Sequence, residues 1–328
     1  YRNTWRGKMK KRERVIRAIK GEEVDKIPSG FSLHFPTSVA KGEQAVEAHL
    51  DFFEKTDTDI IKIMNENLVP VVSGIKEPED FDKIPAVSMN DEFMKHQVEL
   101  TKRILEKSDP TAFSLGTLHG IVASSVHPFE MGGMEYLKAR KFVLDSLRKN
   151  EKPVLAAFDR ITEGMCELAK TYIHLGVDGV YYAALGGEAD LLTDEEHTRW
   201  FKPYDLKIMK AIKEAGGYCF LHICKDGLNM ERYRDYGELT DVANWGVYEA
   251  PFSLKEGRKL FPKTCIMGGL KNRSGVLIDG SKEEIHQAVK DIAEEAGRTS
   301  FILGADCTLP TEIPYERVRM AVEAARTL

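Results

Sequence analysis

The chain has 328 residues, of which 42% are hydrophobic and 30% are charged. This composition is typical of a folded globular protein and excludes the disordered and fibrous classes. Lysine and arginine number 47 against 52 aspartates and glutamates, so the net charge of −5 lacks the positive surplus that binding to a nucleic-acid backbone requires. We therefore expect no nucleic-acid partner.

The longest segment without Asp, Glu, Lys or Arg is residues 111–129. Its hydroxyl groups, glycines, histidines and proline make it too polar to span a membrane, so we predict a buried strand followed by a loop, and no membrane partner. The first eight residues contain no apolar core of a secretory signal. The five cysteines are too sparse for a disulfide framework, and we expect a cytoplasmic protein with reduced thiols.

Short apolar segments alternate with longer helical patterns along the chain, which is typical of βα units and a parallel sheet. Capping boxes at Thr193 and Ser281 begin two helices, of which the first is expected to end at Gly216. Three further helices are predicted at 92–107, 134–150 and 153–175. We predict eight strands, at 27–33, 59–64, 112–118, 179–184, 218–224, 242–248, 265–270 and 300–305.

Eight strands are the number that closes a (β/α)8 barrel, the TIM barrel. No linker, repeat or low-complexity tract divides the chain, so we predict a single α/β domain over residues 1–328. A doubly wound open sheet is the alternative, because periodicity does not show whether a sheet closes. No Gly-x-Gly-x-x-Gly follows the first predicted strand, which argues against a dinucleotide-binding form of that alternative.

The segment Leu221-His222-Ile223-Cys224 carries the sharpest chemical signal. Side chains alternate between the two faces of a strand, so His222 and Cys224 point the same way and lie at the end of a predicted strand. Barrel enzymes hold their chemistry at this end of the strands. A second thiol, Cys307, follows the last predicted strand and would open onto the same face.

One imidazole and two thiolates form a ligand set that suits zinc and leaves a coordination position for chemistry. We therefore predict that His222, Cys224 and Cys307 bind zinc. Glu249, at the end of the sixth predicted strand, is a candidate fourth ligand that leaves when substrate arrives. The alternative for a cysteine is a small buried hydrophobe, which we predict for Cys166, Cys219 and Cys265, and the alternative for a histidine is a hydrogen-bonded core residue.

Other polar residues follow predicted strands, where they would line a substrate pocket or lie in ordinary solvated loops. The pocket candidates are His34, Asn65, Glu66, His119 and Tyr181, and further residues at such positions are Asn67, Tyr182, Asn244 and Asp306.

The ends of the chain carry a family resemblance. Residues 11–28, KRERVIRAIKGEEVDKIP, and the closing segments GADCTLP at 304–310 and RVRMAVEAAR at 317–326 resemble the uroporphyrinogen decarboxylase superfamily. MGGL at 267–270 and the segment 192–224 fit the same pattern, so the resemblance covers nearly the whole chain. It implies a (β/α)8 barrel, in agreement with the strand count.

Within that superfamily, decarboxylases are known for an arginine-rich segment after the first strand, and here residues 29–36, SGFSLHFP, contain no arginine. The chain instead resembles the zinc- and corrinoid-dependent methyltransferases, of the methylcobalamin:coenzyme M methyltransferase type, whose His-x-Cys and distant Cys match His222, Cys224 and Cys307. Cobalamin-independent methionine synthase has a similar order of ligands that includes a glutamate, which is a further reason to consider Glu249.

The resemblance implies transfer of a methyl group between a small molecule, a methyl ether or a thiol, and a corrinoid (cobalamin). An Asp-x-His-x-x-Gly corrinoid motif is absent from the sequence, so the corrinoid is expected on a separate partner protein. Methyl-ether demethylation is one direction of this reaction. The rival hypotheses are a metal-free uroporphyrinogen decarboxylase and a noncatalytic barrel that binds a small molecule.

Overall fold

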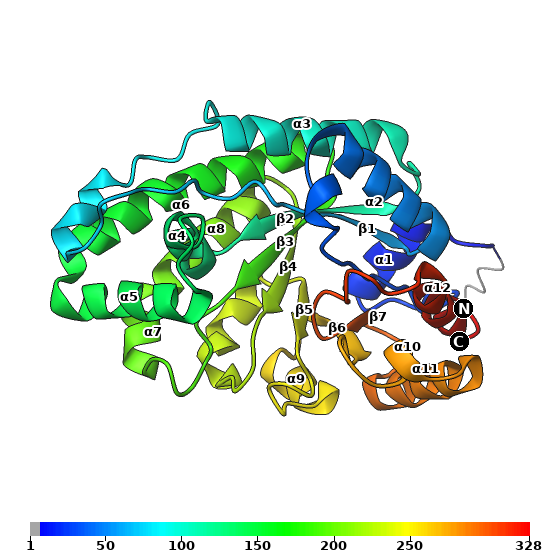
Figure 1. Ribbon diagram of the computed structural model, residues 1–328. Helices are drawn as coiled ribbons and strands as arrows, with labels where there is room; N and C mark the ends of the chain where they lie inside the picture. Colours follow the sequence, from blue (N-terminus) through cyan, green and yellow to red (C-terminus); the bar gives the residue numbers. More distant parts are fainter. Residues whose placement is uncertain (1–6) are drawn as a thin grey trace.

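The computed structural model describes residues 7–328. Its central feature is a curved parallel sheet in which the strands neighbour one another in chain order, with helices on the outside (Figure 1). The strands of this sheet are β1 (Ile60–Ile63), β2 (Phe113–His119), β3 (Gly179–Ala184), β4 (Tyr218–Ile223), β5 (Val242–Trp245), β6 (Cys265–Leu270) and β7 (Phe301–Ala305).

The segment 27–33, predicted as the first strand, does not form a regular strand. Two isolated parallel bridges join it to β7 and to the loop that follows β7. On its other side, the carbonyl of Ser29 accepts hydrogen bonds from the N–H groups of Asp59 and Ile60, at 3.1 and 3.2 Å. Pro28 has no N–H to donate to a ladder, which interrupts regular pairing. The segment nevertheless occupies the eighth position between β7 and β1, and the predicted (β/α)8 barrel is confirmed.

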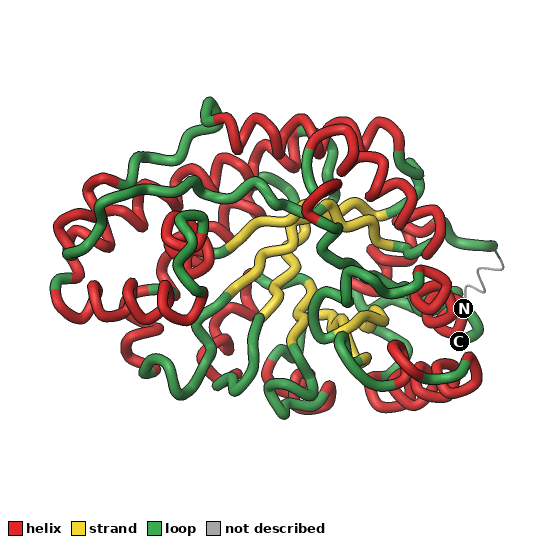
Figure 2. Tube along the Cα trace, in the orientation of Figure 1, coloured by secondary structure: helices red, strands yellow, loops and turns green. Residues whose placement is uncertain are grey.

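The helices form the outer layer around the sheet, and the tube in Figure 2 shows the strands enclosed by helices and loops. Within residues 7–328, the 3₁₀ helices are η1 (Thr37–Val39), η2 (Pro78–Lys83) and η3 (Met230–Leu239). The α-helices are α1 (Lys11–Ile19), α2 (Gly42–Thr56), α3 (Glu92–Lys107), α4 (Ile121–Glu130), α5 (Tyr136–Lys149), α6 (Glu151–His174), α7 (Asp194–Trp200), α8 (Lys202–Glu214), α9 (Leu254–Leu260), α10 (Val276–Asp279), α11 (Lys282–Ala296) and α12 (Tyr315–Ala325).

One predicted loop is a helix, and one predicted helix is divided into two. The loop expected after the strand at 112–118 is the helix α4, which is buried on all sides except at its final residue and therefore shows no alternation of apolar and polar faces. The helix expected from Thr193 to Gly216 is two helices, α7 and α8, separated at Phe201. Pro203 lies at the start of α8, where its missing N–H breaks no helical hydrogen bond.

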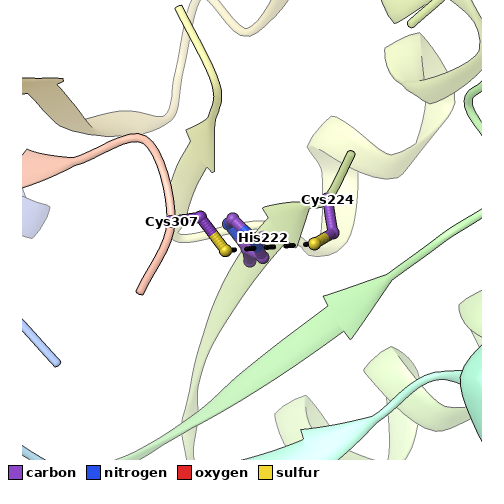
Figure 3. A group of neighbouring side chains, drawn as sticks. All are labelled: His222, Cys224 and Cys307. Atoms are coloured by element: carbon purple, nitrogen blue, oxygen red, sulfur yellow. Dashed lines mark hydrogen bonds between the residues drawn. The ribbon is translucent and has the colours of Figure 1, made fainter. Parts of the chain in front are cut away.

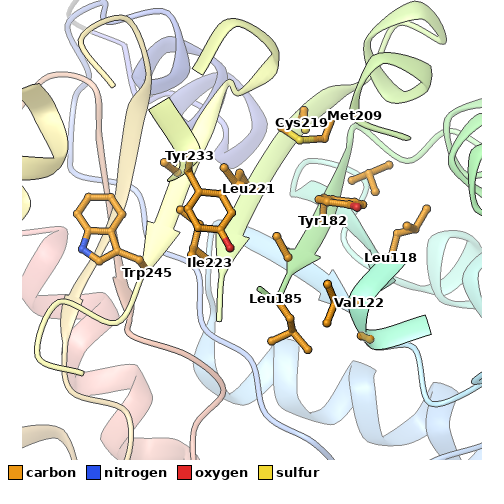
Figure 4. Close-up of a cluster of buried hydrophobic side chains, with 14 of the residues drawn as sticks. Leu118, Val122, Tyr182, Leu185, Met209, Cys219, Leu221, Ile223, Tyr233 and Trp245 are labelled. Atoms are coloured by element: carbon orange, nitrogen blue, oxygen red, sulfur yellow. The ribbon is translucent and has the colours of Figure 1, made fainter. Parts of the chain in front are cut away.

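The main hydrophobic core lies between the outer face of the sheet and the helices (Figure 4). Cys219 is completely buried in this core, as predicted, and Cys166 also lies there. Cys265 packs in a second cluster inside the barrel, among residues such as Phe113 and Phe220 at the start of the strands. Within residues 7–328, no helix is both long enough and apolar enough to cross a bilayer.

Candidate metal centre

His222, Cys224 and Cys307 come together at the carboxyl end of the barrel strands. His222 is the fifth residue of β4, Cys224 follows that strand directly, and Cys307 lies two residues beyond β7. Their ligand atoms all lie within 4.8 Å of one another, and the two sulfur atoms are 4.0 Å apart. Figure 3 shows the two sulfur atoms pointing toward each other beside the imidazole.

The imidazole of His222 is oriented by Asn244 of β5. Its Nδ1 lies 2.6 Å from the Asn244 side-chain oxygen, Oδ1. The Asn244 Nδ2 donates hydrogen bonds to the carbonyls of Met267 and Ala305, at 2.8 and 3.1 Å, so the Oδ1 atom must be the one that faces His222. His222 Nδ1 therefore carries the proton, and its Nε2 presents a lone pair.

This Nε2 atom is buried and has no hydrogen-bond partner among the described residues. A buried polar atom without a partner costs free energy unless a ligand satisfies it. A histidine that binds a metal through one nitrogen usually donates its other N–H to an oxygen acceptor, which is the arrangement of His222 and Asn244.

The two thiols have different pKa values. The hydrogen bond with Cys224 holds the pKa of Cys307 well below its usual range, and His222 lowers it further. The same contact with Cys307, together with burial, raises the pKa of Cys224. A divalent cation would remove the remaining proton, because a thiol that coordinates a metal is deprotonated.

The donor set and its spacing fit zinc. Two sulfurs that each lie about 2.3 Å from a tetrahedral zinc ion are roughly 3.8 Å apart, close to the separation seen here and far longer than a disulfide bond. The cluster consists of one imidazole and two thiols, the ligand types that zinc prefers.

A cavity of about 300 Å³ opens in front of these three residues. Its wall contains each of the five predicted pocket residues, His34, Asn65, Glu66, His119 and Tyr181. The cavity also has an apolar side, contributed by Met64, Leu68, Ala123, Val126 and Leu185. This volume lies at the lower end of the range for small-molecule sites.

The predicted pocket residues are connected by contacts with one another and with the centre. His34 Nδ1 is hydrogen-bonded to the carboxylate of Glu66. His119 Nε2 lies 2.9 Å from the carbonyl oxygen of Asn65, and burial lowers the pKa of His119, which favours its neutral form. Tyr181 stacks on the His222 ring with 5.2 Å between ring centroids.

Glu249 does not join the cluster. Its side chain is exposed, and its carboxylate lies outside the group of ligand atoms within 4.8 Å. Burial of part of the side chain raises the pKa of Glu249, and negative charge at Cys307 and Asp226 adds to this effect. The strand predicted to carry it to the rim ends at Trp245, and the turn that follows is held by the Asp306 carboxylate, which accepts a hydrogen bond from the Val247 N–H at 3.1 Å.

Sequence reasoning missed several residues of the cavity wall, among them Lys62, and it missed the contact that Asn244 makes. Lys62 of β1 lines the cavity although the strand around it, Ile60–Ile63, is otherwise isoleucine. A lysine within such an apolar strand indicates that its side chain faces a cavity or solvent instead of the hydrophobic core. Asn244 was recognised only as a polar residue near a strand end, because its hydrogen bond to His222 depends on the pairing of β4 with β5.

Comparison with known proteins gives three consistent results. Residues 61–328 match the family described as uroporphyrinogen decarboxylase (URO-D). Proteins named methylcobamide:CoM methyltransferase MtbA are similar to this chain, with 21% identity over 252 residues in Methanosarcina acetivorans and 22% over 253 residues in Methanosarcina mazei. Each alignment covers 77% of this chain and 69% of the relative.

Among solved structures, a methyltransferase from Methanosarcina mazei superposes with a TM-score of 0.77 and 18% identity, covering 97% of this chain and 98% of that chain. A B12-independent methionine synthase from Shewanella sp. W3-18-1, in complex with selenomethionine, has a TM-score of 0.58 and 12% identity, covering 92% and 97% of the two chains. At these identities the structural matches establish a shared fold. The family match extends over most of the chain, so this protein belongs to the uroporphyrinogen decarboxylase (URO-D) family.

Proposed function

We propose that this protein is a zinc-dependent methyltransferase that moves a methyl group between a small molecule and a corrinoid carried by a separate protein. The main support for the proposal is that a ring nitrogen of His222 and the sulfurs of Cys224 and Cys307 lie within 4.8 Å of one another at the carboxyl end of the barrel. Its similarity to two methylcobamide:CoM methyltransferases supports the reaction class.

His222, Cys224 and Cys307 would hold the zinc ion. When bound, zinc lowers the pKa of a coordinated thiol, or polarises an ether oxygen as a Lewis acid. Asn244 holds the His222 ring in the tautomer whose Nε2 is free to coordinate. Glu249 is exposed beside the cluster, and we keep it as a candidate fourth ligand in the resting protein.

The cavity supplies the binding site for the small molecule, a methyl ether or a thiol. Its apolar wall excludes water from the reacting atoms, and the neutral His119 and the His34–Glu66 pair offer hydrogen bonds to the substrate. The corrinoid would approach from the open end of the barrel, where Cys224 and Cys307 are only half-buried. We expect the partner protein to dock at this face.

Uroporphyrinogen decarboxylation is the alternative, since the family takes its name from that reaction. Its substrate carries several carboxylates, which arginine side chains bind best because the guanidinium group donates two parallel hydrogen bonds. Within the described part of the chain, the cavity wall contains no arginine. The cavity therefore favours a substrate with fewer charges.

Metal analysis of the purified protein, expressed with zinc supplied, tests the centre. We expect about one zinc per chain in the wild type and a large loss in Cys307→Ser. Cys166→Ser is the matched control, because Cys166 lies on α6 outside the cluster, and it should retain its zinc. A wild-type protein without zinc would contradict the proposal.

Activity is tested by an anaerobic screen of methyl ethers and thiols with a corrinoid protein, followed by the visible spectrum of cobalt. A change in the spectrum that requires both the zinc protein and one substrate supports methyl transfer. Conversion of uroporphyrinogen by metal-free protein would support the decarboxylase instead.

A further inference from the structure

Within residues 7–328, Cys224 and Cys307 are the only cysteines whose sulfur atoms lie in contact. The two sulfurs are 4.0 Å apart, although the residues are separated by 83 positions in the sequence. Figure 3 shows each side chain directing its sulfur toward the other. All five cysteines are free thiols, so this pair is reduced in the structure. Closure of the barrel has therefore placed two thiols where a covalent bond between them is within reach.

Small molecules in solution have access to both of these sulfurs. Cys224 and Cys307 are half-buried, and both line the cavity of about 300 Å³ in front of the centre. The other cysteines, Cys166, Cys219 and Cys265, are buried in the hydrophobic clusters. The oxidation of a thiol depends on its exposure, so an oxidant meets the pair before it meets the other thiols.

Only a small movement separates this pair from a disulfide. The sulfurs of a disulfide are about 2.05 Å apart, so the two atoms must approach by about 2 Å. Rotation of the two side chains supplies part of this approach, and the turn after Cys224 is exposed at residues 225–227. Lys225 in that turn has a φ of 80°, which costs free energy for a residue other than glycine. The backbone next to Cys224 is therefore able to adjust when the sulfur moves.

The disulfide and the metal-bound state of this pair exclude each other. Zinc holds two thiolate sulfurs roughly 3.8 Å apart and uses a lone pair of each. In a disulfide the sulfurs carry no negative charge and lie much closer together, so two of the three candidate ligands are lost at once. Only the His222 imidazole then remains. Oxidation of the pair would release the ion, and a bound ion would hold the sulfurs apart.

We propose that Cys224 and Cys307 are a redox modification site, in which a hydroperoxide converts the metal-free pair into a disulfide and bound zinc keeps the pair reduced. One sulfur, as a thiolate, attacks the O–O bond of the hydroperoxide. The S–O bond of a sulfenic acid forms, the O–O bond breaks, and the second oxygen takes up a proton and leaves as water or an alcohol.

The second thiol completes the reaction. Its sulfur attacks the sulfur of the sulfenic acid, the S–S bond forms, and the S–O bond breaks as water leaves with the thiol proton. The two sulfurs together lose two electrons, and these reduce the hydroperoxide. A dithiol reductant reverses the change by thiol–disulfide exchange, after which the pair is again free to bind zinc. This chemistry does not depend on methyl transfer.

Counting the free thiols of the metal-free protein by mass spectrometry tests the proposal. The protein is treated with stoichiometric hydrogen peroxide and alkylated in denaturant. We expect five alkylated thiols before oxidation and three after it, with a cross-link between the peptides that contain Cys224 and Cys307. Dithiothreitol should restore five thiols and zinc binding. Five free thiols after oxidation, a disulfide that joins two chains, or a sulfinic acid without a cross-link would overturn the proposal.

The zinc-loaded protein, treated in parallel, tests the protection by the metal. We expect the cross-link to form at least about 10-fold more slowly than in the metal-free protein. Equal rates in a protein that holds zinc would overturn the protective role. A protein that binds no zinc but forms the cross-link would contradict the proposed metal centre and support the redox pair, so the two hypotheses fail separately.

Serine variants test whether the pairing is specific. Cys307→Ser should form no disulfide, and the sulfenic acid left at Cys224 should react with dimedone. Cys166→Ser is the matched control, because Cys166 lies on α6 outside the pair, and it should form the same cross-link as the wild type. A disulfide between Cys224 and another cysteine in Cys307→Ser would contradict the assigned pairing. Thermal unfolding of each variant, measured first, excludes a loss of the fold.

Discussion

Two buried polar clusters in this barrel each contain a histidine nitrogen without a hydrogen-bond partner among the described residues. They differ in the groups that surround the histidine and in whether a cavity reaches it. At the metal centre the atom is His222 Nε2, and in the second cluster it is His197 Nδ1. We call the second one the tyrosine cluster, which consists of Tyr182, His197, Asp205, Tyr233 and Tyr236. The two clusters are separated by the sheet, because the neighbouring residues Tyr181 and Tyr182 of β3 point to opposite faces.

The tyrosine cluster is joined by hydrogen bonds among its own members, although the Tyr233 hydroxyl has no partner among the described residues. The Asp205 carboxylate accepts hydrogen bonds from the hydroxyl groups of Tyr182 and Tyr236, the second at 2.6 Å. His197 stacks beside Tyr236, and their Nε2 and hydroxyl oxygen are 3.3 Å apart. A buried histidine is therefore not enough to indicate a metal site. The centre differs because two thiols converge on the imidazole and a cavity gives access to it.

Substitution of the two histidines tests this comparison most strongly. His222→Ala removes one of the three proposed ligands, and we expect zinc affinity to fall at least about 100-fold, together with the proposed methyl transfer. His197→Phe keeps a ring in the tyrosine cluster, and its zinc affinity should stay within about twofold of the wild type because the sites are separate. Competition with a chromophoric chelator measures both affinities. Equal loss in the two variants would show that the clusters are coupled.

Asn244 offers a finer test of the centre. Asn244→Leu leaves the His222 Nδ1 proton without its acceptor, and the lost orientation should weaken zinc binding about 10- to 100-fold. Asn244→Asp keeps an acceptor oxygen for that proton, so its zinc affinity should be higher than that of Asn244→Leu. Chelator competition again provides the measurement. A purely structural role for Asn244 would make the two variants equally weak.

The fold could be predicted from the sequence because its signals are local. Capping boxes at Ser281 and Thr193 mark helix starts, and both are present in the structure. The predictions failed where periodicity carries no information. The helix α4 is buried on nearly all sides, so it has no polar face, and the segment 27–33 is apolar like a strand but is joined to β7 only by isolated contacts.

The site residues also divide into those that local sequence patterns predict and those that depend on how the strands are paired. Strand alternation predicts that His222 and Cys224 share a face, and barrel closure predicts that Cys307 reaches the same end. Lys62 could not be assigned to the cavity in this way, because its position depends on where β1 lies relative to Tyr181 of β3. The contact of Asn244 depends on strand register, which local patterns do not reveal.

Zinc should stabilise the fold through one cluster only. An ion that binds the folded chain at 100 times its dissociation constant adds about 3 kcal/mol to the free energy of unfolding. We expect thermal unfolding of the wild type to shift upward when zinc replaces a chelator in the buffer. The shift should vanish in His222→Ala and persist in His197→Phe. A shift that persists without His222 would place the stabilising ion elsewhere.

The difference in the pH dependence of stability between the wild type and an Asp205 variant should report the tyrosine cluster. Burial raises the pKa of Asp205 to about 7, although hydrogen bonds from Tyr182 and Tyr236 act to lower it. The unfolded chain releases this proton near pH 4, so between about pH 4 and 7 the folded chain binds more protons than the unfolded chain. The contribution of Asp205 is therefore complete below pH 4 and is lost as the pH rises toward 7.

Asp205→Asn removes this titration while it keeps a polar group between the two tyrosines. Urea unfolding at pH 5, 6 and 7 should show that the wild type loses about 2 kcal/mol more than the variant over this range. Groups at the metal centre titrate in both proteins, so their contribution cancels in the difference. Parallel pH profiles would mean that Asp205 is ionised in the folded protein, and its two tyrosine hydroxyls would then stabilise a charge instead of a neutral acid.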